Sequence, residues 1–362
     1  MTHSTPAPDN RLDGPLSTRD FRRRMAAAVD PLQVPSALAT TGVIAAQWLA
    51  MLLAAGVAGA AKRGLTGSAD LLHGWGRLAA PQAVLLACVM ALCVLVMLSR
   101  QHALGVILHD ASHGRLYADR RANDIVCNWT CAFPLFLSVG AYRLGHLPHH
   151  LFTNTANDPH WRRLRADEGL VFPMPKRRLL RLLAGDLVGF VPRGLALARA
   201  LCGPERAKVM RLLVASRSDR VQLSAFWLIV AAALAGAGAG GWFVLLWLLP
   251  RFVLLAPVDR LRLIAEHDLE SRADEFGRTR TVRGTWLERA LFAPLNINFH
   301  VEHHLFPGVP LYRLPTLHRL LAQQPEYRAA VHVWPSYFSG RDSLFNHLTT
   351  CEANGANRLA IE

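Results

Sequence analysis

The sequence predicts an all-α integral membrane protein, in which four transmembrane helices carry a cytosolic helical cap. Three observations support this fold class. Only 18% of the 362 residues are charged, whereas roughly 25% are charged in an ordinary soluble domain. Uncharged stretches are long enough to cross a bilayer, and many of the 16 histidines gather in short motifs outside them. The 6 cysteines are too few and too scattered for a disulfide scaffold.

Two long uncharged stretches open the predicted membrane domain. Residues 36–61 include no charged residue. The stretch is longer than the ~20 residues that a helix needs to span hydrocarbon, so it forms the first expected span. Residues 78–99 form the second, which Arg100 closes at the interface. Residues 1–30, which precede this domain, are polar and rich in proline. We expect them to form a disordered cytoplasmic tail rather than a signal peptide.

A third uncharged stretch, residues 221–250, is interrupted by the glycine- and alanine-rich segment 236–241. A straight helix of this length would overshoot a hydrocarbon core of ~30 Å. We therefore expect two spans, 221–235 and 242–258, joined at the glycines. Arg251 falls inside the second of these spans, and its side chain is expected to extend toward the nearer interface.

The basic residues select the orientation of the chain in the membrane. They flank the first span on its N-terminal side, close the second and precede the third, whereas the glycine-rich hairpin has none. The positive-inside rule therefore places both termini in the cytoplasm, together with the cap formed by residues 100–220 and 259–325. Residues 31–325 make up the membrane domain, and 326–362 form a C-terminal cytoplasmic tail.

The same topology accounts for the formal net charge of +14, so we expect no nucleic-acid partner. The basic residues are overwhelmingly arginines, which is typical of bacteria with GC-rich genomes. The expected location is therefore a bacterial inner membrane, with the histidine-rich cap on the cytoplasmic side.

Eight histidines occur in three motifs at helical spacing. They are His109 and His113 in the first motif, His146, His149 and His150 in the second, and His300, His303 and His304 in the third. Side chains at these spacings project from one face of a helix, where they can offer several nitrogen ligands to a metal. The second predicted span can continue as a helix to the first motif, since no proline intervenes. Pro148 predicts that the helix of the second motif begins near Gly145.

His267 is a ninth candidate, and the predicted topology places all nine on one side of the membrane. Nine imidazoles exceed the four ligands of a typical zinc site, so they predict a site for two metal ions. Ligand type alone leaves zinc, copper, nickel and iron open. Four carboxylates near the motifs are candidates for orienting the imidazoles, namely Asp110, Asp158, Glu266 and Glu302.

Other histidines have weaker signals. His102 is interpreted as a plain histidine at the interface. His160 is either a solvated loop residue or a group at the rim of the site. His318 has no partner at ligand spacing and is treated as background.

The three motifs and their surroundings resemble the membrane fatty acid desaturase family. His109–His113, His146–His150 and His300–His304 look like its three histidine boxes, in the same order and on the expected side of the membrane. The segment Asn157–Pro159 after the second box is also similar. The resemblance covers roughly residues 35–325.

This resemblance implies a non-haem di-iron centre that uses O2 to attack a hydrocarbon chain. The family's ligand role transfers to the eight box histidines, and His267 matches an additional histidine of such enzymes. Asn296 or Asn298 is then an outer ligand or orients one. The expected reaction introduces a double bond into a fatty acyl chain. Because the chain has neither a His-Pro-Gly-Gly haem motif nor a nucleotide fingerprint, electrons come from a separate ferredoxin or cytochrome b5 with its reductase.

Two alternatives remain open at this point. A hydroxylase or ketolase of a carotenoid or another lipid could use the same di-iron centre. A membrane zinc metalloprotease is more remote, because it needs the motif His-Glu-x-x-His. Asp110 takes the place of that glutamate in the first box, and Val301 takes it in the third.

Overall fold

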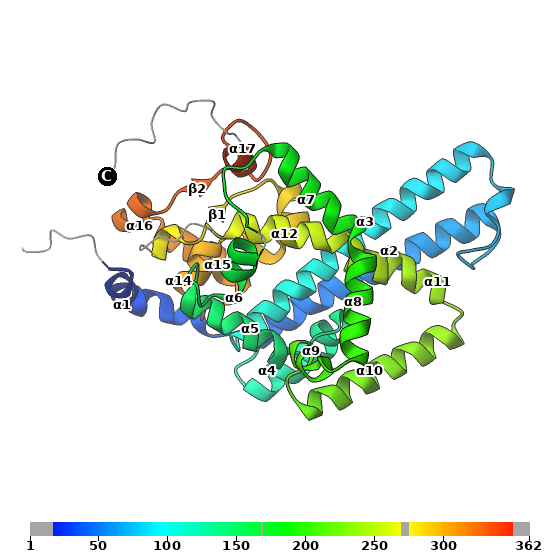
Figure 1. Ribbon diagram of the computed structural model, residues 1–362, viewed down its shortest axis with the longest axis horizontal. Helices are drawn as coiled ribbons and strands as arrows, with labels where there is room; N and C mark the ends of the chain where they lie inside the picture. Colours follow the sequence, from blue (N-terminus) through cyan, green and yellow to red (C-terminus); the bar gives the residue numbers. More distant parts are fainter. Residues whose placement is uncertain (1–16, 168, 269–274, 350–362) are drawn as a thin grey trace, which may run out of the picture.

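The computed structural model describes residues 17–167, 169–268 and 275–349, and this part of the chain is mostly helical (Figure 1). The outer parts of the two predicted tails, residues 1–16 and 350–362, lie outside the described residues.

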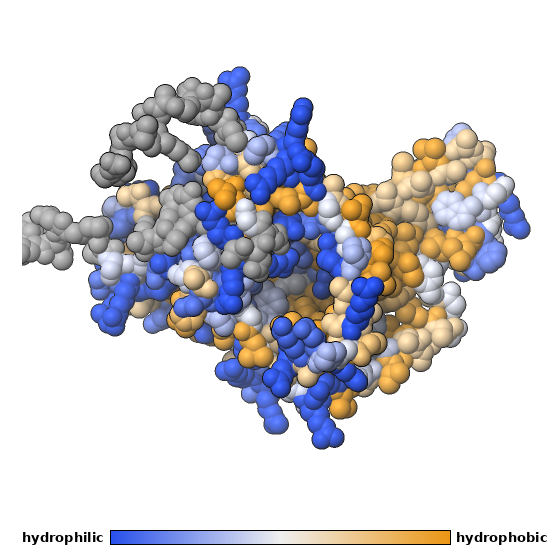
Figure 2. Space-filling view, viewed as in Figure 1, coloured by the Kyte–Doolittle hydropathy of each residue, from blue (hydrophilic) through white to orange (hydrophobic). Residues whose placement is uncertain are grey.

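Within the described residues, four helices are long and apolar enough to cross a membrane. They are α2 (Ala37–Thr66), α3 (Ala80–Ser112), α10 (Arg217–Gly236) and the helix Gly240–Glu266, which combines α11 (Gly240–Phe243), two wider helical turns and α12 (Leu255–Glu266). Each expected span coincides with one of these helices over most of its length, and residues 36, 78 and 79 precede the helices. The break between α10 and α11 falls at the predicted glycines, where Gly238 adopts a positive φ of 60°. Figure 2 shows apolar surface over the part of the molecule built from these helices.

Helix α3 extends well past the expected span. Its 33 residues give a length of ~50 Å, which exceeds a ~30 Å hydrocarbon core, so one end projects beyond the membrane. Its last turns carry His109 and are almost wholly buried from Met97 to Ser112. The helix therefore reaches the first histidine motif without a break, as the sequence predicts.

Between α3 and α5 the chain folds back sharply. Helix α4 (Arg120–Cys127) continues through wider and tighter turns to Leu135, and α5 (Val139–Phe152) follows at an angle of 89°. The backbone at this bend is buried, and the carbonyl groups of Phe133 and Pro134 accept hydrogen bonds from two tryptophan side chains. This pair of helices is apolar enough to form a fifth, broken span.

The remaining elements form the polar part of the molecule. The helices are α6 (Pro159–Trp161), α7 (Lys176–Val188), α8 (Phe190–Cys202), α9 (Arg206–Leu213), α13 (Trp286–Phe292), α14 (His300–Leu305), α15 (Leu314–Leu321), α16 (Pro325–Ala330) and α17 (Leu344–Thr349). Strands β1 (Thr281–Val282) and β2 (Val333–Trp334) pair in parallel, with Thr281 opposite Val333. This pairing joins the C-terminal segment to β1, which lies before α13 and α14 in the chain.

The described part of the N-terminal tail is ordered, contrary to the expectation for residues 1–30. Helix α1 (Thr18–Val29) buries Phe21, Met25 and Val29, which are four residues apart and therefore form one apolar stripe. Ser17 caps the helix by accepting a hydrogen bond from the Asp20 backbone amide. The proline-rich composition of the first residues does not extend into this stripe.

The C-terminal segment beyond residue 325 also packs on the rest of the protein rather than forming a separate tail. Tyr327, Tyr337, Leu344 and Leu348 are buried in the same apolar core as α1 and α14. The folded domain therefore extends to at least residue 349.

Candidate metal centre

Four elements bring the nine candidate histidines together. His109 lies in the last turn of α3, and His113 caps its C-terminal end. The second motif lies on α5, the third forms α14, and His267 follows α12 directly. Pro148 lies inside α5, which begins at Val139, so the predicted start near Gly145 is wrong. Because proline has no backbone N–H, α5 lacks one backbone hydrogen bond at this position.

The first group of imidazoles, cluster one, draws on all three motifs. Its members are His109, His113, His146, His150 and His303. One ring nitrogen from each lies within 4.8 Å of those of all the others. The Nε2 atoms of His113 and His146 are 2.9 Å apart, and those of His150 and His303 are 3.1 Å apart.

The second group, cluster two, is formed by His149, His267, His300 and His304. Its nitrogens also lie within 4.8 Å of one another. The Nε2 atom of His267 is central, since it is 2.9 Å from that of His149 and 3.1 Å from that of His300. His267 thus joins the third motif to the second, as its candidacy in the sequence requires.

The chemistry of both clusters fits metal ions. Both ring nitrogens of His109 and the Nε2 atom of His304 are buried without a hydrogen-bond partner, which is costly unless another group uses their lone pairs. Burial, reinforced by the neighbouring imidazoles, holds the pKa values of His300, His303 and His304 well below the usual value, so these rings are neutral and can donate lone pairs. The described residues of both clusters supply only imidazole nitrogen, a donor set that suits iron, zinc or copper.

Asp158 orients a histidine of cluster two. Its carboxylate accepts a hydrogen bond of 2.9 Å from Nδ1 of His149, which leaves Nε2 of that ring pointing into the cluster. Backbone amides of Asn154 and His160 also donate to it. Burial alone would raise the pKa of Asp158, but these hydrogen bonds, above all that from His149, lower it below the usual value. The carboxylate is therefore charged and fully paired.

Glu302 has a different role from the one that its position in the third motif suggests. Its buried carboxylate points away from the clusters and accepts hydrogen bonds from Thr281 (2.6 Å) and Tyr327 (2.7 Å). His318 donates to the same carboxylate through Nδ1. Glu302 therefore fixes α14 to the surrounding core. His318, treated as background in the sequence, is part of this support, and no spacing signal links it to Glu302.

Asp110 and Glu266 also have partners outside the clusters. One oxygen of Asp110 accepts a hydrogen bond of 3.3 Å from the Leu311 backbone amide, and the other is buried without a partner. Glu266 accepts a hydrogen bond of 2.6 Å from Arg262 and lies 3.8 Å from the Nε2 atom of His300. Of these two carboxylates, Glu266 lies near a cluster histidine, whereas Asp110 contacts the backbone.

The two asparagine candidates bond to backbone carbonyl groups. The side-chain amide of Asn296 donates to Leu311, and that of Asn298 donates to Val282. The side-chain oxygen of Asn298 is buried without a partner. Both residues hold the segment that leads into α14.

His102 and His160 are closer to the site than their sequence contexts suggest. His102 is buried and hydrogen-bonds through Nδ1 to the Leu291 carbonyl at 3.0 Å. The ring of His160 stacks on that of His149 at 4.4 Å, and the two form a third group with Asp158 whose ligand atoms lie within 4.8 Å.

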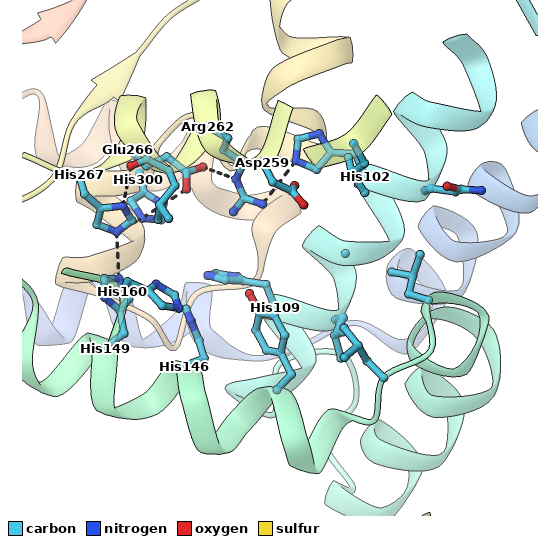
Figure 3. Close-up of a pocket in the computed structure, with 18 of the residues that line it drawn as sticks. His102, His109, His146, His149, His160, Asp259, Arg262, Glu266, His267 and His300 are labelled. Atoms are coloured by element: carbon cyan, nitrogen blue, oxygen red, sulfur yellow. Dashed lines mark hydrogen bonds and ion pairs between the residues drawn. The ribbon is translucent and has the colours of Figure 1, made fainter. Parts of the chain in front are cut away.

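A cavity of about 300 Å³ adjoins both clusters. Histidines of the clusters line one part of it, and Leu135, Leu137 and Leu255 line another. Figure 3 shows Asp259 and Arg262 on the side of the cavity opposite His146. The cavity lies directly beside the candidate metal centre, and its volume is at the lower end of the range for small-molecule pockets.

Comparison with known proteins agrees with this arrangement. The dihydrorhizobitoxine desaturase of Bradyrhizobium elkanii is 27% identical over 269 residues, which cover 71% of this chain and 76% of that protein. The human sphingolipid delta(4)-desaturase/C4-monooxygenase is 25% identical over 255 residues, covering 64% of this chain and 66% of the relative. Residues 83–336 match the profile of the fatty acid desaturase family and include all nine histidines. The chain is therefore an oxidoreductase with helices suited to span a membrane, and it belongs to the fatty acid desaturase family.

Proposed function

We propose that this protein is an O2-dependent oxidase that introduces a double bond into a fatty acyl chain, with two iron ions held by the nine histidines. Cluster one would hold one ion and cluster two the other. The observation that carries the proposal is the separation of nine imidazoles, six buried and three half-buried, into two convergent groups beside one cavity. Removing hydrogen from an unactivated CH2 group exceeds the power of side-chain acids and bases, and iron with O2 supplies that oxidising chemistry when bound.

The residues around the clusters hold and shield the site. Asp158 fixes the tautomer of His149, and Glu302 anchors the helix that contributes to both clusters. The apolar side chains of Leu135 and Leu137 line the cavity and exclude water from the hydrocarbon. The protein itself therefore supplies ligation, orientation and an apolar wall beside the metal centre.

A second candidate function is hydroxylation of a lipid at the same centre. The name of the human relative records both reactions, desaturation and C4-monooxygenation. Both begin with removal of hydrogen from carbon, so the outcome depends on how the substrate lies beside the metal. The family supports a lipid substrate in either case.

The electron donor and the orientation complete the proposal. The chain receives electrons from a separate ferredoxin or cytochrome b5 with its reductase, because its sequence has no haem or nucleotide motif of its own. Both termini and the clusters face the cytoplasm of a bacterial inner membrane, following the distribution of basic residues.

Metal content tests the proposal directly. Purified protein in detergent should contain about two iron ions per chain. His109→Ala should remove iron from cluster one and His267→Ala from cluster two, each lowering the content measured by mass spectrometry. His73→Ala is the matched control, because His73 is exposed and lies outside both clusters. A single zinc ion that is insensitive to His267→Ala would contradict the proposal.

The reaction type is then read from the lipids of expressing cells. Desaturation yields products that have lost two hydrogens, whereas hydroxylation yields products that have gained one oxygen. Neither product should form with His109→Ala. Unchanged lipids in wild-type cells supplied with a matching donor would argue against both reactions.

A further inference from the structure

Several charged side chains line the cavity beside the clusters. In addition to the histidines, five ionisable side chains line it: Arg163, Arg251, Asp259, Arg262 and Glu266. All but the first belong to the helix Gly240–Glu266, which is long and apolar enough to cross a membrane. Of these, only Arg251 lies within the expected span 242–258, where an ionisable residue is costly and usually marks a substrate path.

Arg262 and Glu266 already satisfy each other. The Nε atom of Arg262 donates to Glu266 at 2.6 Å, one helical turn away. This pair needs no ligand, and it forms the wall of the cavity nearest His300.

Arg251 is different, because its guanidinium is incompletely paired. One Nη atom donates to the Leu135 carbonyl at 3.3 Å, while the Nε atom is buried with no hydrogen-bond partner. The side chain lines the cavity, whereas the sequence predicts that it extends toward the interface. A half-buried guanidinium that lines a cavity and has an unused donor is suited to bind an anion that enters the cavity.

Asp259 provides the opposite charge in the same space. Its side chain is exposed to the cavity, and within the described ranges it has no hydrogen bond or ion pair. The guanidinium of Arg251 acts on it only through space. The cavity therefore presents one incompletely paired cation and one carboxylate without a hydrogen bond, an arrangement that matches a ligand carrying both an anionic group and a hydrogen-bond donor.

We propose that the substrate enters this cavity as a free acid whose carboxylate binds Arg251 and whose neighbouring amine or hydroxyl group donates to Asp259. The inference rests on the proposed function, since it names the head group of the molecule that the clusters would oxidise. Such a substrate is not esterified to a glycerolipid or a thioester carrier at this carboxylate.

The helix also sets the distance between head group and oxidised carbon. Asp259 precedes His267 by eight residues, which corresponds to ~12 Å along a helix. The oxidised position is therefore several bonds from the amine or hydroxyl group that donates to Asp259. The leucines that line the cavity between the two ends would contact the intervening chain.

Binding of four short probes tests the head group. Octanoic acid, methyl octanoate, octylamine and α-aminooctanoic acid are titrated into the full-length protein in nanodiscs, and their affinities are measured by calorimetry. α-Aminooctanoic acid should bind most tightly. Arg251→Gln should weaken both acids about 10- to 100-fold and leave the ester unchanged. Asp259→Asn should weaken only the two amines.

Two further variants keep the test decisive. Arg251→Lys retains the cation and should preserve the preference for acid over ester, which separates a lost charge from a disturbed helix. Arg220→Gln removes an exposed arginine outside the cavity and should change nothing. The inference is overturned if the ester binds as tightly as the acid, or if Arg251→Gln behaves like Arg220→Gln. Iron content, measured on the same samples, reports separately on the proposed function.

Discussion

Asp158→Asn offers a sharp test of how the protein holds cluster two. The carboxylate of Asp158 accepts hydrogen bonds from His149 and from the backbone amides of Asn154 and His160. An asparagine side chain has only one acceptor oxygen, so its NH2 group must face at least one of these donors. The loss of a hydrogen bond to a charged group costs about 1.5–3 kcal/mol.

This cost translates into metal affinity, because Asp158 fixes the ring of His149 in the orientation that the cluster needs. Since about 1.4 kcal/mol corresponds to a factor of ten, affinity at cluster two should fall about 10- to 100-fold. Cluster one shares no ligand with cluster two and should keep its affinity. The variant should therefore lose about half of its iron at a chelator concentration that wild-type protein withstands.

The assay is iron retained per chain after dialysis against increasing chelator. Asp124→Asn is the matched control, because Asp124 is a paired carboxylate that contacts Arg143 and no histidine. Equal retention by Asp158→Asn and wild-type protein would refute the assigned role of Asp158. Simultaneous loss of both ions would refute the independence of the two clusters.

Two further predictions concern stability. Tyr327→Phe removes a donor to the buried carboxylate of Glu302, so the free energy of unfolding should fall by about 1–3 kcal/mol in denaturant titrations. Tyr117→Phe should lower it less, because the hydroxyl of Tyr117 contacts Thr41 in an exposed hydrogen bond. Burial would raise the pKa of Glu288, but hydrogen bonds from Thr285, Ser336 and Phe338 lower it overall. A carboxyl with a lowered pKa stabilises the fold above its unfolded pKa of about 4.3. The difference in Tm between wild type and Glu288→Gln should therefore shrink as the pH falls below about 5, and a constant difference would contradict this.

The membrane spans could be predicted from the sequence because hydropathy is a local property. Uncharged runs of sufficient length correspond to helices, and Gly238 marks the break between α10 and α11. The ends were harder to predict. The apolar side chains of residues 18–29 form a stripe only when the segment is a helix. The stripe stabilises the fold only by packing on a core formed by segments about 280 residues later in the chain.

The division of the histidines between the two clusters follows a simple local rule that the sequence alone does not reveal. On α5, His146 and His150 are four residues apart and share cluster one, while His149 points to cluster two. On α14, His300 and His304 share cluster two. Pairs at i and i+4 thus stay together, because they are separated by only about 40° around the helix. Which cluster each pair joins depends on how the helices pack, and spacing does not encode that.

The support beneath the third motif has a consequence for biosynthesis. Glu302 is buried and needs Tyr327 as a partner, a residue that is translated 25 positions later. A buried carboxylate without its donors is strongly destabilising. The membrane helices can therefore insert during translation. The candidate metal centre can reach its final geometry only after Tyr327 has been translated. Delivery of the proposed iron ions is thus expected to follow translation of Tyr327, when the membrane helices are already inserted.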